Sequence, residues 1–191
     1  MYQNFLYNST FYLLLVAIDQ AFANIAKQEG CPCCGGKLNI ANYPRSPFGV
    51  PAQFRSMFDE RYSLCCNTCR RRITPQSVRF FGRRWFPAPL LLLISILKRG
   101  ASSRRCAQIK RHLGIVVNPS TWRRWQRWWS MAFPTTLFWQ QSKGLLIATL
   151  QATDNHYPGA LLDMFQGKFT EKICLLLRFL APLTAGDLRA V

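Results

Sequence analysis

Apolar residues near the N-terminus recur with the spacing of an amphipathic helix. The run Asn8-Ser9-Thr10 supplies side chains that favour the N-cap position, and Gly30 stands where a helix commonly ends. This pattern predicts a helix over residues 10–28. The apolar face expected for it consists of Leu14, Ile18, Phe22 and Ile25.

A different pattern begins at Gly30 and continues to Pro89. Glycines and prolines here separate short apolar segments, which is typical of turns between short strands. We expect strands at residues 62–64 and 77–81. This part of the chain is therefore predicted to be a small β ribbon.

Three short helices are predicted after this ribbon. Residues 90–97 are apolar and end in two cations and a glycine, as buried helices often do. Residues 103–113 carry apolar side chains at positions i, i+3 and i+7. Asn118-Pro119-Ser120 begins the third helix, with proline near its first helical position.

The C-terminal third has a weaker pattern. A loop or short helix is expected near residues 137–150, followed by a helix that breaks at Gly167 and resumes over residues 170–180. The chain is thus predicted to be mainly α-helical with a small β ribbon. Its expected segments are an N-terminal helix (1–29), the ribbon (30–86), the three-helix region (87–131) and C-terminal helices (132–191) that pack on the core or contact a partner.

A helix that crosses a bilayer needs about 20 consecutive apolar residues. The longest strongly apolar runs, residues 11–18 and 90–97, are much shorter. Ala21-Phe22-Ala23 is similar to a signal-peptide cleavage site, but no Lys or Arg precedes the apolar run and Asp19 lies just before the site. We therefore expect a cytoplasmic protein with no membrane segment.

Positive charge is concentrated in the middle of the chain. The 191 residues include 25 Lys and Arg but only 8 Asp and Glu, which gives a formal net charge of +17. Of the cations, 17 lie between residues 55 and 127, and no acid occurs between Arg61 and Asp154. The same stretch is rich in aromatic residues, so we expect it to fold. Such a basic folded region is typical of nucleic-acid-binding proteins.

Six of the 8 cysteines fall in two clusters. Cys31-Pro32-Cys33-Cys34 and Cys65-Cys66-Asn67-Thr68-Cys69 each contain a C-x-x-C motif, and the 31 residues between the motifs suffice for a strand-loop-strand return. Paired motifs of this kind typically bind one structural Zn²⁺ through four thiolates. We predict one zinc ion, bound by Cys31, Cys34, Cys66 and Cys69.

Two alternatives remain open for this ligand set: Cys33 substitutes within the first motif, or Cys65 within the second. A redox dithiol in the first motif is less favoured, because the sequence lacks the βαβ pattern expected around one. Cys106 and Cys174 lie at apolar helical positions, where a buried thiol that only packs is the ordinary interpretation.

Arginines follow the second cysteine motif directly. With later residues of the ribbon, they are expected to form a basic surface that contacts phosphates. The residues expected there are Arg70, Arg71, Arg72, Arg79, Arg83 and Arg84.

The helix that begins at residues 118–120 is predicted to have two opposite faces. At about 100° per residue, Trp122, Trp125 and Trp129 fall on one side and three arginines on the other. We expect the tryptophans to anchor the core rather than to stack on bases. The arginine face, without any acid nearby in the sequence, is expected to bind nucleic acid.

The order of these helices fits a helix-turn-helix, although the turn at Val116-Val117-Asn118 is longer than usual. The last helix of this motif enters the major groove, and the preceding helix crosses the backbone. The residues expected to face the groove are Ser120, Thr121, Arg123, Arg124 and Arg127, and those expected near phosphates are Arg104, Arg105, Lys110 and Arg111.

Cys31-Pro32-x-Cys34-Gly35-Gly36 and Cys66-x-x-Cys69-Arg70-Arg71-Arg72-x-Thr74, followed by the Arg/Trp helix, resemble a known pattern. They are similar to the zinc-ribbon and helix-turn-helix DNA-binding regions of bacterial insertion-sequence transposases and their small accessory proteins. The resemblance covers residues 30–130. It implies zinc in the ribbon and specific binding to element ends or to a regulatory site.

The sequence does not contain the usual catalytic patterns of recombinases. A carboxylate-type transposase needs three convergent acids on an α/β core, whereas the acids here lie near the two ends of the chain or adjacent at Asp59-Glu60. Residues 154–157, Asp-Asn-His-Tyr, include metal-binding side chains, but a polar loop is the favoured interpretation. We therefore predict that the chain is not an enzyme.

These expectations combine into one functional hypothesis. The chain is predicted to be a zinc-stabilised, nucleoid-associated protein of a bacterial mobile element that binds specific double-stranded DNA. It acts beside a separately encoded transposase or recombinase, or as a regulator, and a second copy of the chain is a candidate partner. The alternative is a zinc-ribbon RNA-binding or protein-assembly module, with bases or a partner on Phe80, Phe81, Trp85 and Phe86.

Overall fold

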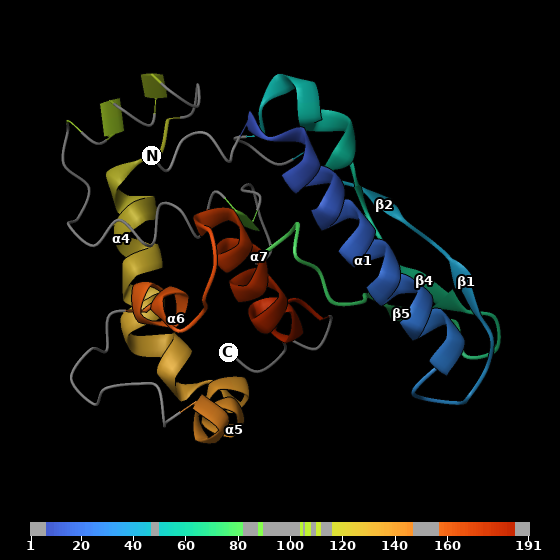
Figure 1. The fold of residues 1–191 in the computed structure, drawn as a ribbon. Helices are drawn as coiled ribbons and strands as arrows, with labels where there is room; N and C mark the ends of the chain where they lie inside the picture. Colours follow the sequence, from blue (N-terminus) through green and yellow to red (C-terminus); the bar gives the residue numbers. More distant parts are fainter. Residues whose placement is uncertain are drawn as a thin grey trace.

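The computed structural model describes residues 7–46, 50–81, 88–89, 104, 106–107, 110–111, 116–146 and 157–185. This part of the chain is mostly helical with a small antiparallel sheet region, as predicted (Figure 1). The α-helices described are α1 (Ser9–Glu29), α4 (Pro119–Arg127), α5 (Leu137–Leu146), α6 (Gly159–Asp163) and α7 (Phe169–Leu180).

Helix α1 begins and ends where the sequence predicts. The Asn8 side chain caps its N-terminus, with Oδ1 accepting a hydrogen bond from Phe11 N at 3.3 Å, and Gly30 ends it with φ +79°. The predicted apolar face is only partly correct, because Ile18 and Phe22 pack against the main core but the other two residues do not. Leu14 and Ile25 remain 47% and 50% exposed, while the buried side chains are Phe11, Tyr12, Leu15 and Asp19.

Aromatic packing and one carboxylate explain this rotation of α1. The Tyr12 ring lies 4.4 Å from the ring of Phe54 and 5.7 Å from that of Phe58, between centroids. Asp19 is buried on the same side of the helix. A count of apolar positions treats Asp19 as an exposed residue, so it places the buried face too far toward Leu14 and Ile25.

Among the described helices, α1 alone is long and apolar enough to cross a membrane by length and composition. In the sequence, the strongly apolar run at residues 11–18 was too short to predict a membrane-spanning helix. Its contacts nevertheless tie it to the rest of the chain, because Phe11, Tyr12 and Leu15 belong to the main core and Asp19 bonds to residues 77–79. In this structure α1 packs against the core along one side, and 22% of its apolar window is buried.

The strands form two small antiparallel sheets. Strands β1 (Leu38–Ile40), β4 (Leu64–Cys66) and β5 (Arg72–Ile73) form one in the order β1-β4-β5, and β2 (Tyr43–Pro44) pairs with β3 (Glu60–Arg61). In the larger sheet Leu38 lies opposite Cys66, and Leu64 lies opposite Ile73. This register places each C-x-x-C motif at a strand end.

The two predicted strands are only partly correct. The one at residues 62–64 overlaps the observed β4 at Leu64 alone. The one at residues 77–81 is not a strand: apart from an isolated bridge at Phe80, the first amides of this segment bond to side chains. Ser77 N donates to Thr184 Oγ1 at 2.7 Å and Val78 N donates to Asp19 Oδ1 at 2.7 Å.

Asp19 is the centre of a buried polar network. Its carboxylate accepts hydrogen bonds from Ser77 Oγ at 2.5 Å and Arg79 Nε at 2.8 Å, in addition to the one from Val78 N. The Arg79 guanidinium also donates to the backbone oxygens of Met57 and Glu60. The Asp19–Arg79 ion pair therefore holds α1, residues 77–79 and the 3₁₀ helix at Ala52–Met57 together.

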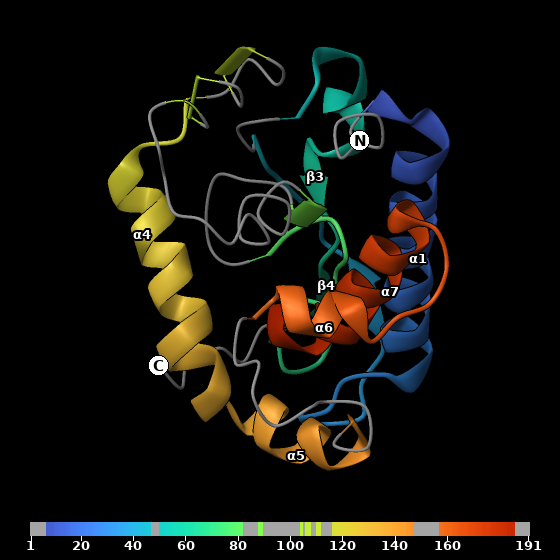
Figure 2. The ribbon, with the colours of Figure 1, turned by 60° about the vertical axis from the view of Figure 1, so that its left-hand side comes forward.

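The main core lies between α1 and the C-terminal helices. It includes buried residues from each of the four segments expected from the sequence, among them Tyr12, Phe58, Trp122 and Leu177. In both ribbon views α7 lies between α4 and α1 (Figures 1 and 2). The division into segments 1–29, 30–86, 87–131 and 132–191 stays a prediction.

The C-terminal elements agree with the weaker part of the prediction. Helix α5 occupies residues 137–146, and Gly167, with φ +109°, separates α6 from α7. A 3₁₀ turn at Ala181–Thr184 follows α7, and Thr184 bonds back to Ser77. The predicted helix at residues 90–97 lies outside the described residues.

Candidate metal centre and nucleic-acid interface

The two C-x-x-C motifs adopt the same backbone conformation. In each, the N–H of the first cysteine donates to the carbonyl five residues later: Cys31 to Gly36 at 2.9 Å, and Cys66 to Arg71 at 3.0 Å. The residue after the second cysteine has a positive φ in both, +69° at Gly35 and +59° at Arg70. We call these two turns, residues 31–36 and 66–71, the first and second knuckles.

The knuckles lie against each other across the end of the sheet. Asn67 N, in the second knuckle, donates to the oxygen of Lys37, which follows the first, at 3.0 Å. A Cβ atom at Gly36 would lie 2.7 Å from Thr68 Oγ1 and 3.0 Å from Cys66 Sγ. Only glycine permits so close an approach, which explains the second glycine of the first motif.

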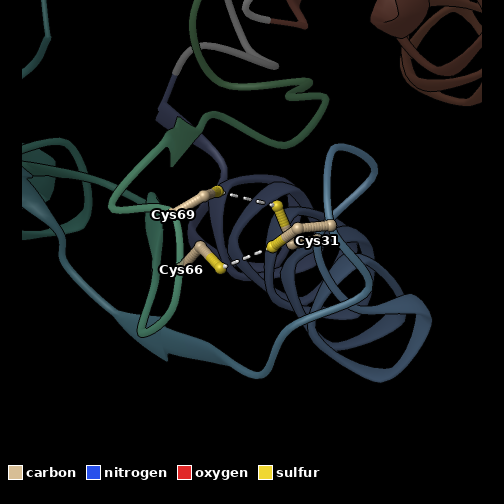
Figure 3. Close-up of side chains that lie close together, drawn as sticks. Cys31, Cys66 and Cys69 are labelled. Atoms are coloured by element: carbon tan, nitrogen blue, oxygen red, sulfur yellow. Dashed lines mark hydrogen bonds between the residues drawn. The ribbon is translucent and has the colours of Figure 1, made fainter.

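The predicted cysteines meet in one cluster. The sulfurs of Cys31, Cys34, Cys66 and Cys69 all lie within 4.8 Å of one another. The Cys31–Cys69 and Cys34–Cys66 sulfur distances are 3.6 and 3.5 Å, and Figure 3 shows the labelled side chains pointing toward one another from the two knuckles. In a tetrahedron with Zn–S bonds of about 2.3 Å, the sulfurs are separated by about 3.8 Å. The cluster is therefore compatible with one structural metal ion.

Backbone amides in the knuckles favour thiolates in this cluster. The N–H groups of Cys69 and Thr68 bond to the Cys66 sulfur and help to lower the pKa of its thiol to about 6. The N–H of Cys33 acts in the same direction on the pKa of Cys31. At Cys69 the N–H of Arg71 also favours the thiolate, but burial and the three neighbouring thiols outweigh it and raise the pKa to about 12. The raised pKa of Cys69 shows the cost of placing a fourth negative charge among these sulfurs, a cost that a cation bound between them would remove.

The other cysteines lie outside this cluster. Cys33 is exposed, and the Cys65 thiol contacts the backbone oxygens of Cys66 and Arg70. The structure therefore favours the first ligand set over both alternatives. Cys174 is buried in the main core and Cys106 packs against it, as expected of packing thiols, and burial raises the pKa of Cys174.

A small hydrophobic cluster includes two of the four clustered cysteines. It contains Cys31, Leu38, Leu64 and Cys66, with Ala26 of α1 packed against it. The end of α1 and the sheet thus hold the knuckles from two sides.

The arginines of the second knuckle are on the surface. Arg70 and Arg71 are exposed, as predicted. Arg72 is also exposed, but its Nη1 donates to Ala41 O at 2.7 Å and its guanidinium lies 5.7 Å from the Tyr43 ring centroid. Arg72 therefore connects β5 to the neighbouring turn in addition to carrying surface charge.

Two central cations are not on the surface. The prediction that Arg79 contributes to the phosphate-binding surface is wrong, because its side chain is buried and paired with Asp19. Arg61 is buried as well, bonded to the oxygens of Pro75 and Thr184, and burial lowers its pKa. The count of 17 cations in residues 55–127 therefore overstates the exposed positive charge of that stretch by two.

Helix α4 has the two faces that the sequence predicts. Trp122 of α4 is 0% exposed and Trp125 is half-buried, and Trp129, in the π-helical turn Trp128–Ala132 that follows α4, is 2% exposed. On the opposite side, Ser120, Arg123, Arg124 and Arg127 are exposed, while Thr121 is half-buried. None of the three arginines forms a salt bridge within the described residues. These four exposed side chains are called the α4 basic face below.

Asn118 caps this helix. Its Oδ1 accepts hydrogen bonds from Ser120 N at 2.9 Å and from Ser120 Oγ at 2.8 Å. We expect Asn118→Ala to reduce the free energy of unfolding by about 1 kcal/mol, since N-cap amide bonds typically contribute that much. Urea unfolding of the two proteins measures this. Asn118→Asp keeps the acceptor, so its free energy of unfolding should stay close to that of the parent. An equal loss of stability in both variants would contradict the capping role.

Several predicted binding residues lie outside the described residues: Arg83, Arg84, Arg105, and also Trp85, Phe86 and residues 154–156. Arg104, Lys110 and Arg111 are described, helical and exposed. The first two helices expected for the helix-turn-helix lie largely outside the described part of the chain. The helix-turn-helix therefore stays a prediction.

The Asp19 network is the main feature that sequence reasoning missed. A lone acid within an apolar helix was the available sign, since an ionised group on a core face needs a partner. Its partner Arg79 is 60 residues away, and no spacing rule connects them.

Comparisons with protein families, with curated proteins and with solved structures find no match to this chain.

Proposed function

We propose that this chain is a zinc-stabilised protein that binds specific sequences of double-stranded DNA and has no catalytic core of its own. The observation that carries the proposal is the α4 basic face: three arginines that form no ion pair within the described residues, opposite tryptophans buried in the core. A face so anchored presents its arginines in a fixed arrangement.

The dimensions of α4 suit the major groove. At about 1.5 Å per residue, Ser120 and Arg127 are separated by about 10 Å along the helix axis. The groove is about 12 Å wide and accepts an α-helix. Arginine side chains bond bidentately to guanine there, and the serine hydroxyl accepts or donates to either base type. We assign Ser120, Thr121, Arg123, Arg124 and Arg127 to the groove, and Arg104, Arg105, Lys110 and Arg111 to phosphates.

The metal centre supports this function as a scaffold. We interpret the β1-β4-β5 sheet with its two knuckles as a zinc ribbon, with Zn²⁺ bound by Cys31, Cys34, Cys66 and Cys69. All four positions are taken by protein thiols, so no ligand position is open for a substrate, and this favours a structural ion. The ion keeps the second knuckle folded, and that knuckle presents Arg70, Arg71 and Arg72 to phosphates, with Arg83 and Arg84 following in the sequence.

The biological setting is inferred from the motif resemblance. We propose that the chain is the recognition or regulatory component of transposition in a bacterial mobile element, located in the cytoplasm with the nucleoid. Its partner would be a separately encoded transposase or recombinase, or a second copy of the chain.

The RNA-binding or protein-assembly alternative has less support. Phe80 is 8% exposed, and the Phe81 ring contacts the rings of Trp128 and Trp129, at 5.6 and 6.1 Å between centroids. Burial of Phe80 and the indole contacts of the half-buried Phe81 leave less ring surface for unpaired bases, and this favours the duplex proposal.

Substitutions should separate base contacts from phosphate contacts. We expect Arg124→Ala to reduce the preference for the best duplex over a random one by about tenfold, since a bidentate base contact contributes about 1–3 kcal/mol. Arg71→Ala should weaken binding to all duplexes alike and reduce the slope of log affinity against log salt by about 1. Fluorescence anisotropy over a salt series measures both.

The control is Arg178→Ala, an exposed cation on α7 outside both basic surfaces. It should change neither the preference nor the salt slope. If Arg124→Ala and Arg71→Ala both lowered the affinity for every duplex equally, the division into base contacts and phosphate contacts would be contradicted. Absence of duplex binding by the parent protein would contradict the proposed function itself.

A further inference from the structure

The two exposed basic surfaces lie on opposite sides of the molecule. One is the α4 basic face. The other is the knuckle surface, defined here as Lys37, Arg70 and Arg71, which are all exposed at the metal centre. In Figure 1, α4 and the β4–β5 sheet region lie at opposite edges with α7 between them, and Figure 2 also separates α4 from α1, whose end supports the knuckles.

This separation is large compared with one DNA groove. A folded chain of 191 residues has an expected radius of gyration of about 16 Å, so it is about 40 Å across. The major groove is about 12 Å wide. A straight duplex with α4 in its groove therefore runs along one side of the protein and leaves the knuckle surface facing away from it.

The knuckle surface has the properties of a second phosphate site. Backbone hydrogen bonds fix both knuckles, and Asn67 N bonded to Lys37 O keeps Lys37 beside the second one. Asn67, Thr68 and Arg72 are also exposed there, and the nearest acid in the sequence is Glu29, exposed at the end of α1. Positive charge on a rigid turn favours sequence-independent contact with a phosphate backbone.

We infer that one chain bridges two separate segments of double-stranded DNA, with the α4 basic face on one segment and the knuckle surface on the other. This inference rests on the proposed function and extends it from recognition to bringing two DNA segments together. The α4 side supplies sequence preference, and the knuckle side supplies contact that is independent of sequence and sensitive to salt.

A capture experiment with the full-length, metal-loaded protein tests this. One short duplex is fixed to beads, a second labelled duplex is free in solution, and retention of the label is measured at several salt concentrations. We expect retention that depends on the protein, and a complex of one chain with two duplexes by mass photometry.

Two double variants test whether the knuckle surface is the one that binds the second duplex. Arg70→Gly with Arg71→Gln removes two charges, and glycine suits the positive φ at position 70, so the knuckle stays folded. A single duplex can bind either surface, so this variant should bind it more weakly, as Arg71→Ala does, with its sequence preference unchanged. It should retain at least about tenfold less label than that weakening alone explains. Lys143→Gln with Arg178→Gln removes two exposed charges elsewhere and should capture like the parent. Metal content confirms that each variant is folded at its centre.

The outcomes separate this inference from the proposed function. Binding of single duplexes without capture, capture only by complexes that contain two chains, or undiminished capture by the knuckle variant would each overturn the bridging inference alone. Failure to bind any duplex would overturn the proposed function.

Discussion

Replacing Cys66 by serine is expected to remove the metal ion from the protein. The Cys66 sulfur is fully buried, lies 3.5 Å from that of Cys34, and accepts amide hydrogen bonds that favour its thiolate. A serine hydroxyl stays protonated at neutral pH and is a poor zinc ligand. Because structural zinc contributes folding energy directly, we expect the free energy of unfolding to fall by several kcal/mol. The unfolding midpoint should fall by at least about 10 °C.

The chain contains its own control for this prediction. Cys33→Ser changes an exposed cysteine in the same knuckle that is not part of the cluster. It should keep one equivalent of zinc and the parent midpoint. Elemental analysis and thermal unfolding, with and without a chelator, measure both properties. Loss of the metal in Cys33→Ser, or a full equivalent retained in Cys66→Ser, would contradict the ligand set.

Replacing Asp19 by alanine is expected to destabilise the main core by about 3–5 kcal/mol, the typical loss when one partner of a buried ion pair is removed. The change leaves the Arg79 guanidinium buried without its counter-ion and removes the acceptor for Ser77 Oγ and Val78 N. Urea unfolding measures the loss. The metal content should not change, because the knuckles form a separate cluster.

Two further variants show whether the pair or the single charge matters. Asp163→Ala removes an exposed carboxylate of α6 and should cost less than about 1 kcal/mol. Asp19→Leu combined with Arg79→Met replaces both charges by apolar groups and should recover much of the loss, since it leaves no uncompensated charge. A loss below about 1 kcal/mol for Asp19→Ala would mean that the network does not connect α1 to residues 77–79.

Local patterns along the sequence predicted much of this fold. The N-cap residues Asn8 and Asn118 begin α1 and α4 as expected, because capping depends on a few neighbouring residues. The opposite faces of α4 followed from helical periodicity alone. The four-cysteine cluster was also predictable, because paired C-x-x-C motifs are a local sequence signal for such a cluster.

Features that depend on distant residues were not predictable in this way. The buried face of α1 is set by Phe54, Phe58 and Arg79, all far away in the sequence. The expected strand at residues 77–81 failed because its amides bond to Asp19 and Thr184. The matching positive φ at Arg70 and Gly35 was also hidden, since arginine rarely adopts this conformation and only the pairing of the knuckles requires it.

The central claim is that the α4 basic face recognises duplex DNA, and selection from random pools tests it most directly. The metal-loaded protein is mixed at physiological salt, with competitor, with a random duplex pool and a random single-stranded RNA pool. The account predicts enrichment of one duplex sequence, and loss of that enrichment when Arg123, Arg124 and Arg127 are changed to Gln. Enrichment of single-stranded RNA alone, or of no sequence beyond salt-sensitive adhesion, would contradict it.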